Sequence, residues 1–241
     1  MSKNNIPRLF INKALLTDMK IELSSDKKHY IKNVLRLKQK DKVNVFNGKD
    51  GEWETIVEDS LAKKLICIKQ IKKQIKESGP TLYFSLIKNH NLRWMIEKVT
   101  ELGVQKLVPI ITDRTNNKNF NDKKALAHIK EASEVSERLT LPTLEKKSNL
   151  LKILEHTKQN SDTIIFCNEA REDDYLQNNL LELNRNKVSF LIGPEGGFSP
   201  DEEKLIKGYS HVRSVKLLDR LVRAETAAIL ALSIFNNYKI R

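Results

Sequence analysis

Short apolar runs alternate with segments of helical spacing over residues 81–238, and this rhythm constrains the fold more than any other feature. The apolar runs predict strands at residues 81–87, 106–112, 163–167, 188–192 and 212–218. Helices are predicted at residues 91–103, 122–139, 148–158, 174–183, 199–208 and 224–238. Strands that are apolar throughout and alternate with helices are typical of a parallel sheet covered on both faces. The predicted fold class is therefore α/β.

The first third of the chain has a different pattern, rich in short strands. Residues 42–59 alternate apolar and polar side chains around Asn47-Gly48 and Asp50-Gly51, which is a hairpin signal. A further strand is predicted at residues 63–71 and a short basic helix at 26–37. Several short strands around one small core indicate a barrel-like module. Gly79-Pro80 marks a linker, so we expect one domain at residues 1–77 and a second at 78–241.

Charge is distributed unevenly along the 241 residues. The formal net charge is +12, and residues 1–80 hold 18 Lys and Arg against 10 Asp and Glu, or +8, so the other 161 residues carry +4. This asymmetry favours a nucleic-acid partner for the first third. A chain that is simply rich in lysine and asparagine is the alternative explanation.

The sequence does not favour a membrane span, a disulfide bond or a metal site. No apolar run approaches the roughly 20 residues that cross a bilayer, and the N-terminus lacks the apolar region of a signal peptide, so a cytoplasmic protein is expected. Cys67 and Cys167 each lie in an apolar run and are expected to be buried thiols of a reducing compartment. The five histidines show no ligand spacing, so no metal site is predicted.

A glycine-rich turn, residues 193–197 (GPEGG), follows the strand predicted at 188–192. Ligands of open parallel sheets bind beyond the carboxyl ends of the strands, where this turn lies. Ser199, Pro200 and Glu202 then form a capping box, which occupies the N–H groups that a phosphate would use, and Glu195 would repel a phosphate. The chain has neither a Walker loop nor a G-x-G-x-x-G motif. The turn therefore suits S-adenosylmethionine, an adenosine carrying a sulfonium cation, and a purely structural turn is the alternative.

A second polar group lies between the last predicted strand and the last helix. Arg220, Arg223, Glu225 and Thr226 follow one another there. We expect this group and the glycine turn, at the ends of neighbouring strands, to line one pocket. The alternative is a solvated salt bridge between Arg223 and Glu225.

Six stretches follow one another along nearly the whole chain: PRLFI, HYIKNVLRLKQKDKVNVFNG, RWMIEKVTELGV, EASEVSER, LIGPEGGFSPDE and RLVRAETAA. Their order and spacing give the sequence a resemblance to the 16S rRNA (uracil-1498-N3)-methyltransferases of the SPOUT superfamily. It implies an N-terminal PUA-like β-barrel that binds RNA and a C-terminal parallel sheet with a trefoil knot. It also implies a homodimer that methylates N3 of uracil 1498 in the 16S rRNA of the 30S subunit, with S-adenosylmethionine as cofactor. Three departures are Leu217-Leu218, where Leu-Gly is usual, Val135, where Gln is usual, and TDRTN at residues 112–116, where Glu-Arg-Ser is commoner.

The resemblance also implies roles for individual residues. Catalysis is assigned to Arg223, Glu225 and Arg114, and RNA binding to Arg8, Arg36 and Arg138. The cofactor is expected to contact Ile192, Gly193, Pro194, Glu195, Gly196, Gly197, Leu217, Leu218 and Thr226.

Methylation at N3 requires loss of a weakly acidic imide proton. A guanidinium near O2 or O4 of the base would stabilise the developing anion, and Arg223, Arg114, Arg138 and Arg8 are the candidates. Glu225 or Glu195 would either assist proton removal or anchor an arginine.

Other functions and another place for the last helix stay open at this point. The alternatives are a SPOUT enzyme that acts on tRNA or a ribose oxygen, and a non-catalytic RNA-binding assembly factor; a dinucleotide oxidoreductase is disfavoured by Glu195. The helix at 224–238 is apolar over more than one stripe, so we expect it to contribute to a dimer interface. Complete burial inside its own domain is the alternative.

Overall fold

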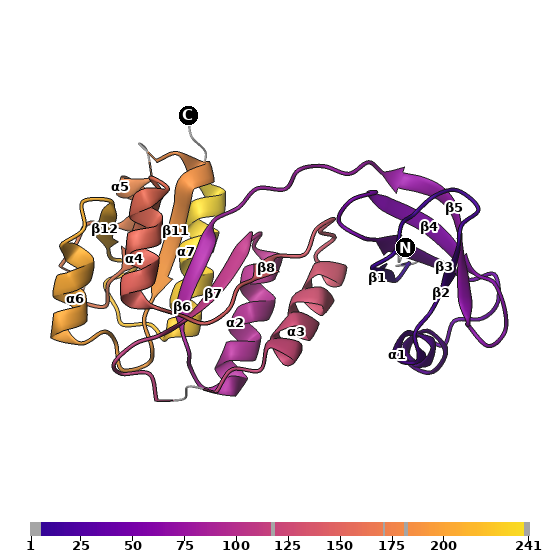
Figure 1. The fold of residues 1–241 in the computed structure, drawn as a ribbon, viewed down its shortest axis with the longest axis horizontal. Coiled ribbons are helices and arrows are strands. Elements are labelled where there is room, and N and C mark those ends of the chain that lie inside the picture. The colour runs from indigo at the N-terminus through magenta and orange to yellow at the C-terminus, as the bar shows by residue number, and fades with distance from the viewer. Residues whose placement is uncertain (1–5, 117–118, 171, 181–182, 239–241) are drawn as a thin grey trace. The chain divides into compact units, whose positions relative to one another are not determined.

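The computed structural model describes residues 6–116, 119–170, 172–180 and 183–238 of the protein (Figure 1). It contains two compact units. The first unit comprises the chain up to Glu77 together with Ser133–Leu141. The second comprises Ser78–Ala132 and the chain from Pro142 onward. A short segment from the middle of the chain is therefore built into the N-terminal unit.

The first unit is organised around a five-stranded mixed sheet in the order β1-β3-β4-β5-β2. The strands are β1 (Arg8–Phe10), β2 (Lys20–Glu22), β3 (Lys42–Phe46), β4 (Glu52–Val57) and β5 (Lys64–Lys72). The predicted hairpin is confirmed, because β3 and β4 pair antiparallel, while β1 joins β3 in parallel. The predicted basic helix is α1 (Ser25–His29) continued by a π-helical turn (Tyr30–Val34).

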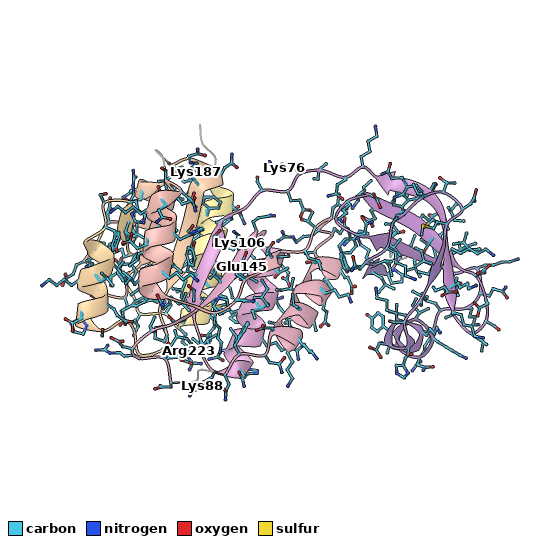
Figure 2. All side chains as sticks on the ribbon, in the orientation of Figure 1. Lys76, Lys88, Lys106, Glu145, Lys187 and Arg223 are labelled. Atoms are coloured by element: carbon cyan, nitrogen blue, oxygen red, sulfur yellow. The ribbon has the colours of Figure 1, made fainter. Side chains whose placement is uncertain are left out.

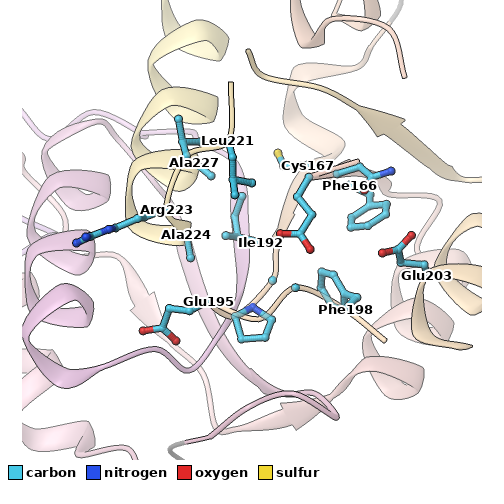
Figure 3. A pocket seen from close by; sticks show the side chains of 16 residues that line it. Phe166, Cys167, Ile192, Glu195, Phe198, Glu203, Leu221, Arg223, Ala224 and Ala227 are labelled. Atoms are coloured by element: carbon cyan, nitrogen blue, oxygen red, sulfur yellow. The ribbon is translucent and has the colours of Figure 1, made fainter. Parts of the chain in front are cut away.

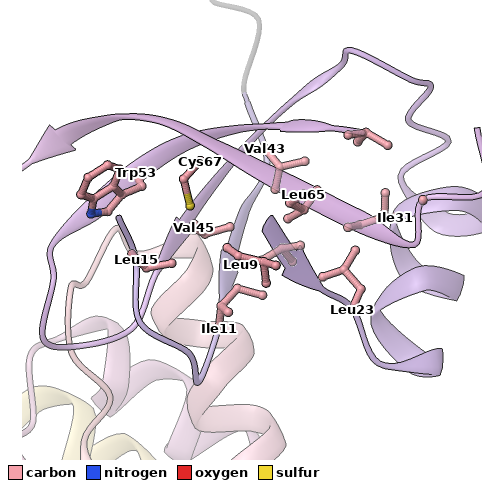
Figure 4. Packing of buried hydrophobic residues seen from close by; sticks show 13 residues of the cluster. Leu9, Ile11, Leu15, Leu23, Ile31, Val43, Val45, Trp53, Leu65 and Cys67 are labelled. Atoms are coloured by element: carbon pink, nitrogen blue, oxygen red, sulfur yellow. The ribbon is translucent and has the colours of Figure 1, made fainter. Parts of the chain in front are cut away.

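A small apolar core fills this unit (Figure 4). Alternate residues of β3 and β4 point into it, as the period of two requires. Gly51 closes the hairpin with φ +76°, and a Cβ there would lie 2.1 Å from the Lys72 carbonyl oxygen, so only glycine fits. The core residues are Leu9, Ile11, Leu15, Ile21, Leu23, Ile31, Val43, Val45, Trp53, Val57, Ala62, Leu65 and Cys67.

The second unit contains a parallel sheet in the order β12-β10-β11-β6-β7-β8, with β9 also paired to β7. Its strands are β6 (Thr81–Ser85), β7 (Lys106–Ile111), β8 (Thr143–Leu144), β9 (Ser148–Asn149), β10 (Thr163–Cys167), β11 (Val188–Ile192) and β12 (Val212–Val215). Each pairing is parallel. All five residues of the central strand β11 are buried, which confirms a sheet covered on both faces.

Helices cover both faces of this sheet (Figure 1). The helices of this part of the chain are α2 (Asn89–Glu101), α3 (Asp122–Val135), α4 (Leu150–Gln159), α5 (Leu176–Asn179), α6 (Pro200–Lys207) and α7 (Ala224–Asn237), with a 3-10 turn at Arg185–Lys187. The last three residues of α3, 133–135, belong to the first unit. Helix α4 packs on β10 and α6 on β12, whereas α7 packs on β11 and on α2. The Phe235 ring of α7 meets the Phe190 ring edge-on, with centroids 5.6 Å apart.

Two predicted helices are shorter in the structure. Helix α3 was expected to reach residue 139 but ends at Val135, and Glu137 then takes φ +59°, which a helix cannot accommodate. The helix expected at 174–183 has α-helical form only over α5, and residues 181 and 182 lie outside the described chain.

No helix among the described residues is long and apolar enough to span a membrane. Both cysteines are free thiols; Cys67 is buried and Cys167 partly so.

Candidate functional site

The glycine turn connects β11 to α6 at the carboxyl edge of the sheet. The predicted capping box is present: Ser199 Oγ accepts from the Glu202 amide and Glu202 Oε2 accepts from the Ser199 amide. Glu202 Oε1 also accepts a hydrogen bond from the Asp113 amide at 2.9 Å. The amides of Ser199 and Glu202 at the start of α6 are thus engaged within the protein, as expected of a turn that does not bind phosphate.

The three glycines of the turn differ in how much space surrounds them. A Cβ on Gly193 would lie 2.9 Å from the ring of Phe198, which is buried. Gly197 has φ +68°, and a Cβ there would lie 1.9 Å from Glu169 Oε1. Gly196 has room, since its nearest neighbour would be Arg114 Cβ at 3.6 Å. Backbone shape therefore demands glycine most strongly at Gly197.

A cavity of about 220 Å³ lies against the turn (Figure 3). Three chain segments and Glu203 of α6 line it; the segments are the end of β10 (166–169), the turn with its flanks (192–195, 197–198), and the start of α7 with the loop before it (221–224, 227). The prediction that the turn and the Arg223 region line one pocket is confirmed. The expectation that their strands are neighbours is wrong, because β10 lies between β11 and β12. The end of β10 therefore forms a further wall of the cavity.

Most of the predicted cofactor residues lie around this cavity. Ile192, Gly193, Pro194, Glu195 and Gly197 line it directly. Leu217 and Leu218 line a smaller adjoining hollow, which shares residues 167–169, 221–222 and 227 with the main cavity. Gly196 and Thr226 are outside both linings, and Thr226 is exposed on α7.

The wall formed by Phe166, Cys167, Asn168 and Glu169 was missed from the sequence. Asn168 is buried and held on both sides, since its Oδ1 accepts from the Ala170 amide and its Nδ2 donates to Asp173 Oδ2 at 2.9 Å. Burial raises the pKa of the Cys167 thiol, which is therefore protonated at neutral pH. The signal that would have found this wall is its position, directly after a buried strand of a parallel sheet.

The charge around the cavity is mainly negative. Glu169, Glu195 and Glu203 contribute carboxylates to its lining, and Arg223 contributes one guanidinium. The remaining side chains are mostly apolar, and the glycine turn offers backbone groups at close range. Such a lining disfavours a phosphate and favours a ligand with a cationic centre and an apolar ring.

The predicted catalytic residues take different positions around the glycine turn. Arg223 is exposed at the N-cap of α7 and extends to the same side as Glu195 in the close-up (Figure 3). Arg114 donates from Nη1 to the Gly196 carbonyl oxygen at 2.9 Å. Glu225 is buried, and its Oε2 has no hydrogen-bond partner among the described residues. Glu195 Oε1 accepts from the Lys88 amide, so this carboxylate also fixes the loop before α2.

The three arginines assigned to RNA binding belong to the first unit and differ sharply in exposure. Arg8 is 8% exposed, pairs with Glu52 at 2.9 Å, and donates to the carbonyl oxygens of residues 133, 134 and 138. Arg138 is buried beside Glu77, and burial lowers its pKa. Arg36 is exposed, with φ +55°. Arg8 and Arg138 therefore anchor the segment 133–141 within the unit, a structural role that the sequence did not reveal.

One group of side chains in the described chain has the geometry of a metal site. Glu97, His128 and Glu131 place one ligand atom each within 4.8 Å of one another. Arg93 Nε already occupies Glu97 Oε1 at 2.7 Å. A guanidinium in this position competes with a cation for the same oxygen.

Comparison with known proteins bears on both units. A family model described as an RNA methyltransferase domain matches residues 76–236, and one described as an RNA methyltransferase PUA domain matches residues 23–71. Ribosomal RNA small subunit methyltransferase E of Rickettsia conorii is 36% identical over 231 residues, covering 94% of this chain and 93% of the relative. The protein of the same name from Buchnera aphidicola (subsp. Schizaphis graminum) is 33% identical over 241 residues, covering 96% of each.

Solved structures share the fold over nearly the whole chain. A protein from Legionella pneumophila, solved in complex with the bound cofactor SAM, superposes with a TM-score of 0.83 at 26% identity, covering 96% of this chain and 97% of that one. Ribosomal RNA small subunit methyltransferase E from Neisseria gonorrhoeae, solved bound to S-adenosyl methionine, gives a TM-score of 0.79 at 21% identity and covers 95% and 96%. Two family models match the chain, and relatives match it along almost their full length. These matches show that this chain belongs to the ribosomal RNA small subunit methyltransferase E family.

Proposed function

We propose that this protein transfers the methyl group of S-adenosylmethionine to N3 of a uridine in 16S rRNA, uracil 1498 by its family resemblance. The observation that carries the proposal is the acidic, partly apolar cavity at the carboxyl ends of β10 and β11. Family membership supports the reaction class, and the SAM-bound Legionella structure supports the cofactor.

The residues of the cavity fit S-adenosylmethionine. Glycines 193 and 197 allow the backbone to approach a flat adenine ring, with Ile192 and Leu217 as apolar neighbours. Glu169, exposed at the cavity wall, offers a carboxylate to a cationic centre. The cofactor supplies an electrophilic methyl group, and the chain holds it and excludes water.

The target base is proposed to lie at the outer side of the glycine turn. Arg114 is fixed there by the Gly196 carbonyl oxygen, and Arg223 begins α7 beside the same cavity. A guanidinium facing O2 or O4 of uracil would stabilise negative charge as the N3 proton leaves. Glu225, buried with an unpartnered oxygen, would receive that proton or anchor an arginine.

RNA binding is proposed to be shared between residues 1–77 and the catalytic domain 78–241. The basic balance of the first third and the exposure of Arg36 support this division. Since Arg8 and Arg138 are occupied inside the first unit, we assign the RNA-facing charge to exposed side chains instead, with Lys32, Lys38 and Lys40 beside Arg36. Ribosomal subunits as substrate place the protein in the cytoplasm.

We also propose that the protein forms a homodimer and that its C-terminal domain contains a trefoil knot. Helix α7 buries Ala231 and Phe235 within its own unit, whereas Ile229, Leu230 and Ile234 are only half-buried. These three apolar side chains form the part of α7 available to a second copy. Replacement of Leu230 by Glu would test the interface, because Ala231 and Phe235 variants would disturb the domain core.

Methyl transfer to isolated ribosomal particles tests the proposed function. The protein is incubated with tritiated S-adenosylmethionine and, in separate reactions, with small subunits, large subunits or tRNA from cells that lack this methyltransferase. We expect label in the 16S rRNA of the small subunits alone. Label in tRNA or in the large subunit would favour another SPOUT enzyme. Tight RNA binding without any transfer would favour an assembly factor.

A further inference from the structure

A second hollow, of about 650 Å³, lies between the N-terminal ends of α2 and α3 in the second unit. It is separate from the cofactor cavity, since the two share no lining residue.

The hollow is cationic, although one of its basic side chains, Arg93, is paired with Glu97. Arg93, Lys123, Lys124 and Lys147 line it, against the carboxylate of Asp122. Lys123 and Lys124 are exposed, and their ammonium groups have no hydrogen-bond or ion-pair partner among the described residues. Two unpaired lysines beside a hollow offer direct contacts to phosphate oxygens.

Groups that recognise bases line the same hollow. Asn89, Asn119 and Asn121 bring amide side chains, and Asn121 Oδ1 caps α3 by accepting from the Lys124 amide at 3.0 Å. Phe120 is half-buried and packs edge-on against Phe84, with ring centroids 6.3 Å apart. Phe120 therefore contributes an aromatic side chain to the lining of the hollow. Cations, amides and an aromatic ring together are the chemistry of a single-stranded RNA site.

Two chain connections place the hollow next to the glycine turn. Asn89 follows Lys88, whose amide donates to Glu195 Oε1 at 3.0 Å. Asn119 lies five residues after Arg114, which donates to the Gly196 carbonyl oxygen. Lys88 and Arg223 also lie at the same end of the second unit (Figure 2). An RNA strand with its target base at Arg114 therefore has nucleotides within reach of the hollow.

We propose that this hollow binds the single-stranded RNA segment flanking the target uridine, with Lys123 and Lys124 on the phosphodiester backbone. The proposal rests on the proposed function, because it assumes that the RNA is the methyl acceptor. It assigns the catalytic domain an RNA contact of its own, in addition to the basic first unit.

The Lys123→Ala/Lys124→Ala double variant tests the hollow. Lys204→Ala/Lys207→Ala, a pair of exposed lysines on α6 outside the lining of either cavity, is the matched control. Steady-state methylation of small subunits gives kcat and KM, filter binding to 16S rRNA gives the salt dependence, and calorimetry gives the cofactor affinity.

For the hollow variant we expect KM for small subunits to rise about tenfold with kcat and cofactor affinity unchanged. The slope of log K against log salt concentration should lose about 1.4, or about 0.7 for each lost contact to single-stranded RNA. The control pair should behave as wild type. An unchanged KM and slope in the hollow variant, or an equal loss in the control pair, would overturn the proposal. A wild-type protein that transfers no methyl group at all would instead overturn the proposed function.

Discussion

Gly197 is the position in the glycine turn at which a side chain should do most harm. Its φ of +68° lies in the left-handed region, which costs an L-residue about 1–2 kcal/mol. A methyl group there would also lie 1.9 Å from Glu169 Oε1, so the Glu169 side chain must rotate away. If the glycine turn of the Gly197→Ala variant relaxes to a less strained conformation, cofactor binding must restore the original backbone conformation of the turn. Gly197→Ala should therefore weaken S-adenosylmethionine binding about 5- to 30-fold.

Calorimetric titration of three variants separates strain from collision. Gly196→Ala is the matched control, because its Cβ would meet Arg114 Cβ at an ordinary 3.6 Å, and its affinity should stay within about twofold of wild type. Glu169→Ala removes the collision, so adding Gly197→Ala to it measures the strain alone. Wild-type affinity in Gly197→Ala, or an equal loss in Gly196→Ala, would refute this account of the turn.

Three further predictions concern stability. Arg8→Ala removes the nearer of the two cations beside buried Glu52 and leaves it only Lys72 Nζ at 3.4 Å, so the free energy of unfolding should fall by about 3 kcal/mol in denaturant titration, while the exposed Arg36→Ala should change it little. Glu202→Ala removes half of the capping box and should cost about 1 kcal/mol, or a melting temperature lower by about 2–4 °C in calorimetry. Burial, and to a lesser degree the charge of Lys158, lowers the pKa of His211. The free energy of unfolding should therefore fall as the pH drops below about 6.5, because the unfolded chain then binds a proton more readily than the folded chain, and His211→Gln should remove that part of the pH dependence.

The longer strands of the parallel sheet were predicted because each is a run of consecutive apolar residues. All five strands predicted over residues 81–218 are present, with β11 buried at every position. Strands β1, β2, β8 and β9 were missed, since two or three residues are too few to show an alternation. Short strands depend on their partners rather than on their own composition.

The site was predicted only where the chain carries a local signal. Glycines and a capping box mark the turn, and the Arg-x-Glu-Thr run marks the start of α7. The wall at Asn168 and Glu169 carries no such mark, and strand order, which puts β10 between β11 and β12, is set by packing across the whole sheet. Likewise, the burial of Arg8 depends on carbonyl groups about 125 residues away, at 133 and 134.

Identification of the methylated nucleoside is the most direct test of methyl transfer to uridine N3. Small subunits from cells lacking this methyltransferase are treated with the protein and S-adenosylmethionine, and the 16S rRNA is digested and analysed by liquid chromatography and mass spectrometry. We expect 3-methyluridine at a single position, formed by the wild-type protein and strongly reduced with Arg114→Ala. A methyl group on a ribose oxygen or on another base, or no new methylated nucleoside, would contradict it.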